Sequence, residues 1–251
     1  MLVVKLKICR KPDSSIPYKF ITVYNIDNHE LGHDLHWNYN MDPVTNQFKT
    51  SLSSKSLAAA IYLDKCTTNS KREYFLSNLR HYLNAYNLTI DVYGPCGDFK
   101  CGRTSLKPCF YRIRTTYYFY LALEDSIATD YITKSVLFAY DNNAVPVVLG
   151  GAQYHRYLPP DSYLDGTQLG EEILAKVMYE AIHNKTKYYD FFKWKNHYSI
   201  KESEVLNACP LCEFLNNEGW LKTGESYLYF RKWWNPFFAE RCGLDKRYVV
   251  L

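Results

Sequence analysis

The sequence predicts an α/β protein built on a doubly wound parallel sheet, and three observations support that fold class. The chain has 251 residues, 47% of them hydrophobic and 22% charged, which is typical of a globular protein with a sizeable core. Short apolar runs alternate along the chain with segments of helical periodicity. Gly94-Pro95 and Gly150-Gly151 supply turns where two of these runs end. Strands that alternate with helices indicate a parallel sheet with helices on both faces.

The first predicted unit is a strand, a helix and a second strand. Leu57–Leu63 is an apolar run of the kind that forms a buried parallel strand. Within residues 70–86, side chains such as Leu79 and Leu83 recur at helical spacing among polar ones. Residues 88–92 then alternate between apolar and polar side chains, as strands do. A β-α-β unit therefore starts near residue 57.

The alternation continues downstream. Residues 117–123 form an apolar, aromatic run and residues 145–149 a second apolar run, so both are predicted strands. Residues 133–142 between them show helical spacing, and a third helix is predicted at about 168–183. Residues 56–251 are therefore predicted to form one Rossmann-like domain, with a cysteine-containing helical region at its C-terminal end.

The front of the chain differs because residues 1–55 show little sustained periodicity. Residues 40–56 are rich in polar and turn-forming residues and are predicted to be a loop or linker. A piece of this length is too short for a domain of ordinary size. We interpret residues 1–55 as part of a second, incomplete domain.

Charge and motif content exclude several classes of protein. The net charge of +4 comes from 30 Lys and Arg against 26 Asp and Glu, spread along the chain without a basic stripe, so nucleic acid is not expected as a partner. Neither a G-x-G-x-x-G turn nor a Walker lysine loop is present, which disfavours dinucleotide oxidoreductases and P-loop NTPases.

Targeting features point in two directions. The apolar start at residues 1–8 is interrupted by lysines and is too short for a signal peptide or a membrane span, so no anchor is expected within the chain. Two N-glycosylation sequons begin at Asn87 and Asn184, and together with eight cysteines they favour an oxidising lumen.

Two chemistries are open for the cysteines, which are Cys9, Cys66, Cys96, Cys101, Cys109, Cys209, Cys212 and Cys242. The favoured one is a set of disulfides, whose connectivity the spacing does not determine. The other is a four-thiolate zinc site in which Cys209 and Cys212 join Cys96 and Cys101.

Candidate binding residues follow two of the predicted strands. Ligands of open α/β sheets lie beyond the carboxyl ends of strands, where helix N-termini direct backbone N–H groups at anions. Residues 64–72 and 124–135 occupy this position, with Arg72 and Lys134 close to predicted helix starts. An arginine beside a helix N-terminus suits a diphosphate, because it adds two charge-assisted hydrogen bonds. The alternative is an ordinary solvated first-turn arginine.

Residues 117–151, YYFYLALEDSIATDYITKSVLFAYDNNAVPVVLGG, resemble the α-1,3-fucosyltransferase family that uses GDP-fucose, most closely at 119–126, 130–133 and 145–151. The similarity covers roughly residues 57–242, in the order and with the gaps of that family. Further matching segments are SKRE at 70–73, DVYGPCG at 91–97, PPDSY at 159–163, FFKWK at 191–195 and CPLC at 209–212.

The resemblance implies a GT-B glycosyltransferase whose C-terminal half binds GDP-fucose and whose N-terminal half binds the acceptor. Residues 1–55 are then a short remnant of the acceptor-side domain plus a linker. The implied reaction moves L-fucose to a GlcNAc hydroxyl of a glycoprotein glycan, with inversion and in α-1,3 linkage. The implied donor-binding residues are Arg72, Tyr131, Asp125 and Lys134.

The resemblance also carries expectations about the rest of the reaction and its setting. Family members take the carboxylate base from the N-terminal domain, and since no motif assigns it here the catalytic residue stays unassigned. GDP-fucose and a glycan are the expected partners, no cofactor is required, and nothing in the residues calls for a divalent metal. The expected location is the Golgi lumen or membrane, reached through an anchor that this chain does not contain.

The chain departs from the family pattern at three places in the donor half. The Glu-Lys pair that follows Tyr-Ile-Thr in the family is Lys134-Ser135 here, Ser-Asn before the first cysteine is Asp64-Lys65, and Glu-Asn has Asp125 in its second position. A carboxylate at Asp64 opposes a diphosphate. Two alternatives are therefore kept: an impaired or inactive relative that binds a nucleotide sugar or glycan, and a partial gene product.

Overall fold

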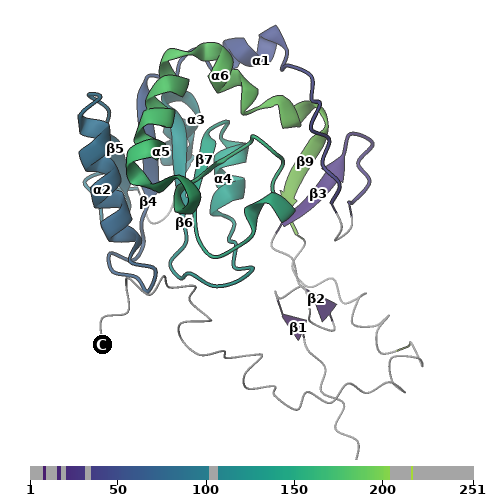
Figure 1. Cartoon of the computed structure of the whole chain (residues 1–251), viewed down its shortest axis with the longest axis horizontal. Coiled ribbons are helices and arrows are strands. Elements are labelled where there is room, and N and C mark those ends of the chain that lie inside the picture. The colour runs from purple at the N-terminus through teal and green to yellow at the C-terminus, as the bar shows by residue number, and fades with distance from the viewer. Residues whose placement is uncertain are drawn as a thin grey trace, which may run out of the picture.

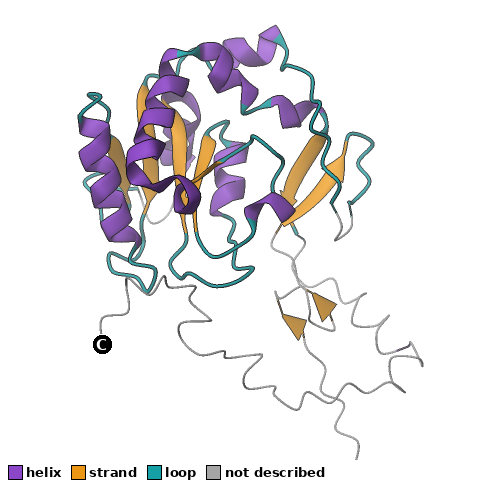
Figure 2. Ribbon diagram, in the orientation of Figure 1, coloured by secondary structure: helices purple, strands orange, loops and turns teal. Residues whose placement is uncertain are grey.

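The computed structural model describes residues 8–9, 16–17, 21–31, 35–101, 107–203 and 216. Its main body is a five-stranded parallel sheet with helices on both faces (Figure 1, Figure 2). This architecture confirms the predicted α/β class.

The sheet contains β4 (Leu57–Tyr62), β5 (Ile90–Tyr93), β6 (Tyr117–Leu123), β7 (Val145–Leu149) and β8 (Leu164–Asp165). The spatial order is β5-β4-β6-β7-β8, and every neighbouring pair is parallel. The chain runs from β4 outward to β5 and then returns past β4 to β6, so the direction of winding reverses between β4 and β6. Open α/β sheets bind ligands at this switch point, outside the carboxyl ends of the strands.

The helices that cover the sheet in the described part of the chain include α2 (Arg72–Asn84), α3 (Lys107–Thr116), α4 (Ser135–Asp141) and α5 (Gly166–His183). Successive strand residues point to opposite faces, so Ala59 packs in one core cluster with Leu79 of α2 and Leu174 of α5. Ala60 packs in another cluster with Ile113 of α3. Figure 1 shows α5 in front of the sheet and α3 and α4 behind it.

The predicted elements agree with the observed ones to within a few residues. β6 and β7 have the predicted bounds. The third helix begins earlier than predicted, at Gly166, because Asp165 caps it by accepting hydrogen bonds from the backbone N–H groups of Thr167 and Gln168. Gly170 interrupts this helix with a φ of 68°, which glycine adopts without strain.

The prediction of a loop or linker over residues 40–56 is wrong in part, because the segment contains α1 (Asn46–Ser51). Thr45 is the N-cap, and its hydroxyl accepts a hydrogen bond from the backbone N–H of Phe48 at 3.2 Å. Val44 and Leu52 flank the helix and are buried in the main core cluster. A short helix with a good cap and two apolar anchors therefore forms despite its polar composition.

Part of the front piece packs on the larger domain. β3 (Ile21–Asn25) pairs antiparallel with β9 (Tyr198–Glu202). Ile21 and Val23 are buried in one cluster with Val136 of α4. A separate parallel pair joins β1 (Ile8–Cys9) to β2 (Ile16–Pro17). The domain division at residues 55 and 56 stays a prediction.

The remaining elements are α6 (Lys185–Asp190) and the 3₁₀ turns η1 (Tyr154–Arg156) and η2 (Lys193–Asn196). Among the described helices, none has the length and apolar character needed to cross a membrane.

Candidate functional site

The fold brings the two predicted binding stretches together at the switch point. The backbone N–H of Ser70 donates to the carbonyl of Asp125 at 3.0 Å, and the hydroxyl of Ser70 donates to the carbonyl of Glu124 at 2.6 Å. These bonds join the loop after β4 to the loop after β6. Both loops then lead into helices, α2 and α4, whose N-terminal ends face the same edge of the sheet.

Arg72 is the first residue of α2, and its side chain turns inward rather than into solvent. The residue is 8% exposed, and its Nη1 atom donates to the carbonyl of Leu123 at 2.7 Å. Its Nε and Nη2 atoms are buried without a hydrogen-bond partner in the described part of the chain. Buried polar groups are normally paired, so these two donors are suited to an anionic ligand. The alternative of a solvated first-turn arginine is wrong.

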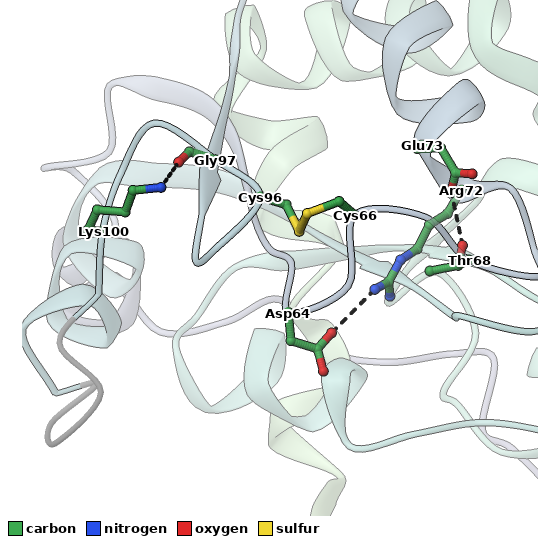
Figure 3. Close-up of a disulfide and its surroundings, with 8 residues drawn as sticks. All are labelled: Asp64, Cys66, Thr68, Arg72, Glu73, Cys96, Gly97 and Lys100. Atoms are coloured by element: carbon green, nitrogen blue, oxygen red, sulfur yellow. Dashed lines mark hydrogen bonds and ion pairs between the residues drawn. A yellow bond between two sulfur atoms is a disulfide. The ribbon is translucent and has the colours of Figure 1, made fainter.

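Asp64 is the carboxylate next to this guanidinium. Its Oδ1 atom lies 3.5 Å from Nη2 of Arg72, and its side chain is 64% exposed. Figure 3 shows the two side chains directed at each other beside the Cys66–Cys96 disulfide. That disulfide ties the loop after β4 to the turn after β5. The carboxylate therefore occupies the solvent side of Arg72, where an anion approaching from solvent would compete with it.

Asp125, Lys65 and Tyr131 form a second group at the same edge. The Nζ atom of Lys65 donates to Oδ2 of Asp125 at 2.8 Å, and the hydroxyl of Tyr131 donates to Oδ1 at 3.2 Å. The bond from Lys65 is the main reason why the pKa of the Asp125 carboxyl is lowered, and the same bond raises the pKa of Lys65. Asp125 is therefore an ionised acceptor held by two donors.

Lys134 differs from the other three predicted donor-binding residues. It is the N-cap of α4, its side chain is exposed, and it makes no side-chain capping bond. No hydrogen bond or ion pair of its ammonium is found with any residue that the structure describes. The structure thus brings Arg72, Asp125 and Tyr131 together and leaves Lys134 at the rim.

Glu124 is a site residue that sequence reasoning did not single out. It directly follows β6 and is 2% exposed, and its Oε1 atom accepts the backbone N–H of Thr133 at 2.8 Å. Burial raises the pKa of this carboxyl to about 7, against the hydrogen bonds from Thr133, which lower it. A glutamate at the carboxyl end of an apolar strand was the available indication.

Two glycines after β7 let the third loop approach this group. A Cβ atom on Gly151 would lie 2.6 Å from the carbonyl oxygen of Ala128. A Cβ atom on Gly150 would lie 2.4 Å from the hydroxyl of Tyr154 and 3.1 Å from Cγ of Glu124. Only glycine fits at such separations. The predicted Gly150-Gly151 turn therefore serves close packing of the site as well as ending the strand.

Four of the described cysteines form disulfides. Cys66 is bonded to Cys96 and Cys101 to Cys109. The zinc hypothesis with Cys96 and Cys101 is wrong, because a sulfur in a disulfide has no thiolate to offer a metal. The other two proposed ligands, at positions 209 and 212, lie outside the described residues. No group of three His, Cys, Asp or Glu placed to hold a metal occurs within the described ranges.

Comparison with known proteins gives consistent matches. The family model described as Glycosyltransferase family 10 (fucosyltransferase) C-term matches residues 52–233. The chain is 34% identical over 196 residues to Alpha-(1,3)-fucosyltransferase C of Drosophila melanogaster, covering 78% of this chain and 43% of the relative. It is 30% identical over 206 residues to Alpha-(1,3)-fucosyltransferase fut-1 of Caenorhabditis elegans, covering 77% and 45%.

The chain therefore spans less than half the length of these two relatives. Among solved structures, a crystal structure of an alpha1,3-fucosyltransferase with GDP-fucose matches at 14% identity and a TM-score of 0.46. That match covers 65% of this chain and 48% of the other.

Proposed function

The chain belongs to glycosyltransferase family 10, the fucosyltransferases, and from this premise we propose that its parallel sheet is the donor-binding half of an α-1,3-fucosyltransferase. The proposed enzyme transfers L-fucose from GDP-fucose to a GlcNAc hydroxyl of a glycoprotein glycan, with inversion at C1. One observation carries the proposal. The guanidinium of Arg72 is buried at the switch point, and within the described residues two of its nitrogens make no hydrogen bond, with Nη2 only within ion-pair distance of Asp64, which suits a diphosphate.

The proposed chemistry follows from the charge that develops on the leaving group. The acceptor oxygen forms a bond to C1 of fucose while the bond from C1 to the diphosphate oxygen breaks. The acceptor hydroxyl gives up its proton to a base, and GDP leaves with the electron pair on its β-phosphate. Arg72 and the N-terminus of α2 are positioned to stabilise that charge at the moment it forms. The base is assigned to no residue of this chain.

The other predicted residues complete the proposed donor site. The Asp125 carboxylate accepts hydrogen bonds from sugar hydroxyls, and Lys65 compensates its charge. Tyr131 lies on the loop that carries Asp125 toward α4, and Lys134 adds an exposed cation at the rim. Arg72 and Lys134 supply positive charge on the side of the diphosphate, and we propose that the reaction proceeds without a divalent metal or a further cofactor.

We propose a luminal, Golgi-type location and a glycan acceptor. Two disulfides in the described ranges support an oxidising compartment. The two sequons lie on exposed positions, at Asn87 and Asn184. The glycoprotein acceptor follows from the activities named for related proteins, such as Glycoprotein 3-alpha-L-fucosyltransferase A of Drosophila melanogaster.

A second candidate function is a relative that binds a nucleotide sugar without turnover. The observation that favours it is the Asp64 carboxylate 3.5 Å from Arg72, which competes with a diphosphate. The replacement of the family's Glu-Lys pair by Lys134-Ser135 acts in the same direction. Restoring the pair with K134E and S135K raises turnover if the scaffold is a transferase, and leaves it at zero if it only binds.

Calorimetric titration of GDP-fucose into the oxidised full chain tests the proposal, with UDP-galactose as the ligand control. Selective binding of GDP-fucose that falls at least tenfold in R72K supports the site, since lysine keeps the charge and loses the two-pronged donor. R80K is the matched control, because Arg80 also donates from α2 to a backbone carbonyl, that of Ile90 at 2.7 Å. A chain that is folded by circular dichroism and binds neither ligand overturns the proposal.

A further inference from the structure

Glu124 is bonded to all three loops that build the candidate site. Its backbone N–H donates to the carbonyl of Leu149 at the end of β7, at 2.9 Å. Its carbonyl accepts the hydroxyl of Ser70, two residues before Arg72, at 2.6 Å. Its carboxylate accepts the backbone N–H of Thr133, just before α4, at 2.8 Å. One residue thus connects the loops after β4, β6 and β7.

The side chain of Glu124 is buried and closely packed. Gly150 lies so close that an added Cβ would be 3.1 Å from Cγ of Glu124. The hydroxyl of Tyr154 lies near the same Cβ position of Gly150 and is buried without a hydrogen-bond partner in the described part of the chain. The side chain therefore has little room to adopt another rotamer. Within the described residues, the backbone donor to its carboxylate is the N–H of Thr133.

The hydrogen bond between Glu124 and Thr133 restrains a loop of the candidate site. Residues 125–133 form the loop that carries Asp125 and Tyr131, and Lys134 follows as the N-cap of α4. The loop leaves the sheet at Glu124 and is brought back to the same residue at Thr133. A loop closed at both ends has less conformational freedom than one closed at a single end. The side chains of Asp125 and Tyr131 are therefore held in place relative to Arg72.

We infer that Glu124 is a positioning residue for the sugar-nucleotide donor, closing the 125–133 loop so that Asp125 and Tyr131 face Arg72. This inference rests on the proposed function and goes beyond it, because the proposed reaction gives Glu124 no contact with the diphosphate or with the reacting atoms. A carboxylate makes a stronger bond to a backbone N–H than a neutral acceptor does. That difference gives a reason for a buried acid at a position where burial opposes its charge.

The test compares E124A with E124Q in the oxidised full chain. E124Q keeps the volume and an acceptor oxygen, so the dissociation constant for GDP-fucose is expected to stay within about threefold of wild type. E124A leaves the N–H of Thr133 unpaired and opens the loop, so the constant is expected to rise about tenfold or more. Hydrogen–deuterium exchange gives the readout specific to positioning: residues 125–134 exchange faster in E124A, and not in E124Q.

I113V is the stability control, because Ile113 of α3 is buried on the far face of the sheet and contacts none of these loops. Both I113V and E124A are expected to lower the melting temperature. Loss of affinity for GDP-fucose and faster exchange at 125–134 are expected in E124A only. Equal donor affinity in E124A and wild type overturns the inference and leaves the proposed function intact. Absence of donor binding by wild type overturns both.

Discussion

The ammonium of Lys65 lies 2.8 Å from the Oδ2 atom of Asp125, across the switch point of the sheet. The two residues belong to different loops and both depart from the family pattern, in which a neutral asparagine occupies each position. The structure joins the two departures into one ion pair. The negative charge added after β6 is therefore compensated by the positive charge added after β4, and neither change stands alone.

A double-mutant cycle of K65M and D125N is expected to show coupling in donor affinity. D125N releases Lys65 toward the diphosphate and tightens GDP-fucose binding, whereas K65M leaves Asp125 uncompensated and weakens it. Stability is expected to change little, because both side chains reach solvent, at 60% and 28% exposure, and solvent screens their interaction. Calorimetry on the four chains measures the coupling. The remote pair of Lys187 and Glu180, at 2.9 Å, is the control cycle, with no effect on binding expected.

Asp64→Asn is expected to tighten GDP-fucose binding by about three- to tenfold. The change removes a carboxylate that competes with the diphosphate for Nη2 of Arg72. The gain shrinks as salt is raised, because the Asp64 side chain is largely exposed and its field is screened. Titrations at low and high ionic strength test this. Unchanged affinity in D64N at low salt would show that the diphosphate binds elsewhere.

The free energy of unfolding is expected to fall as pH rises from about 5 to 7, and E124Q is expected to reduce that slope. Burial raises the pKa of Glu124 to about 7 in the folded chain, from 4.5. The folded state therefore binds more protons than the unfolded state between these values, and loses up to about 3 kcal/mol of stability across the window.

Urea denaturation of wild type and E124Q at several pH values measures this slope. Some slope remains in E124Q, because burial also raises the pKa values of Asp141 and Asp165. Parallel curves for the two chains would mean that Glu124 is not protonated in this range.

Removing the Cys66–Cys96 disulfide is expected to harm both stability and donor binding. The bond closes a loop with a sequence separation of 30, against 8 for Cys101–Cys109. The chain-entropy model gives losses of about 3–4 and about 2–3 kcal/mol respectively. Only the first bond restrains the loop that runs from Asp64 to Arg72 (Figure 3). Paired Cys→Ala variants, compared by thermal melting and calorimetry, should lose donor affinity for the first bond alone.

Asn87 is expected to carry an N-linked glycan when the chain is made in a secretory cell. It is exposed in the turn between α2 and β5, with a φ of 56°. This turn lies at the amino ends of the parallel strands, whereas the candidate site lies at their carboxyl ends. Thr89→Ala removes the sequon without disturbing that backbone, and should abolish one glycosidase-sensitive band shift while leaving donor binding unchanged.

Asn184 serves as the comparison for Asn87, because its Oδ1 atom caps α6 through the N–H groups of Thr186 and Lys187. N184Q is therefore expected to lower the free energy of unfolding by about 1 kcal/mol, besides removing the glycosylation site. A mobility that T89A does not alter would mean that Asn87 is unmodified.

Local patterns determined much of the fold in advance. Residues 117–123 and 145–149 are strands with the predicted bounds, because a run of apolar side chains suits a strand buried on both faces whatever surrounds it. Arg72 was placed at a helix start by the same short-range reasoning. α1 was missed at 46–51, because six residues with a threonine cap give little periodicity to detect.

Pairings across the chain were decided by the tertiary structure alone. β3, at residues 21–25, pairs with β9, at residues 198–202, so the two strands come from distant parts of the sequence. The cysteine connectivity, the bond from Glu124 to Thr133 and the ion pair of Lys65 with Asp125 belong to the same class.

By itself, the sequence determined the α/β class, the strands and helices around the switch point, and the family to which the chain belongs. The tertiary structure decided that Arg72 is buried with two nitrogens that make no hydrogen bond to a described residue, that Lys134 stays at the rim, and that two charge departures cancel. The physical reason is one of range. Backbone preference and hydrophobic periodicity act between near neighbours, whereas the burial and pairing of a charge depend on which distant loops the sheet brings to one edge.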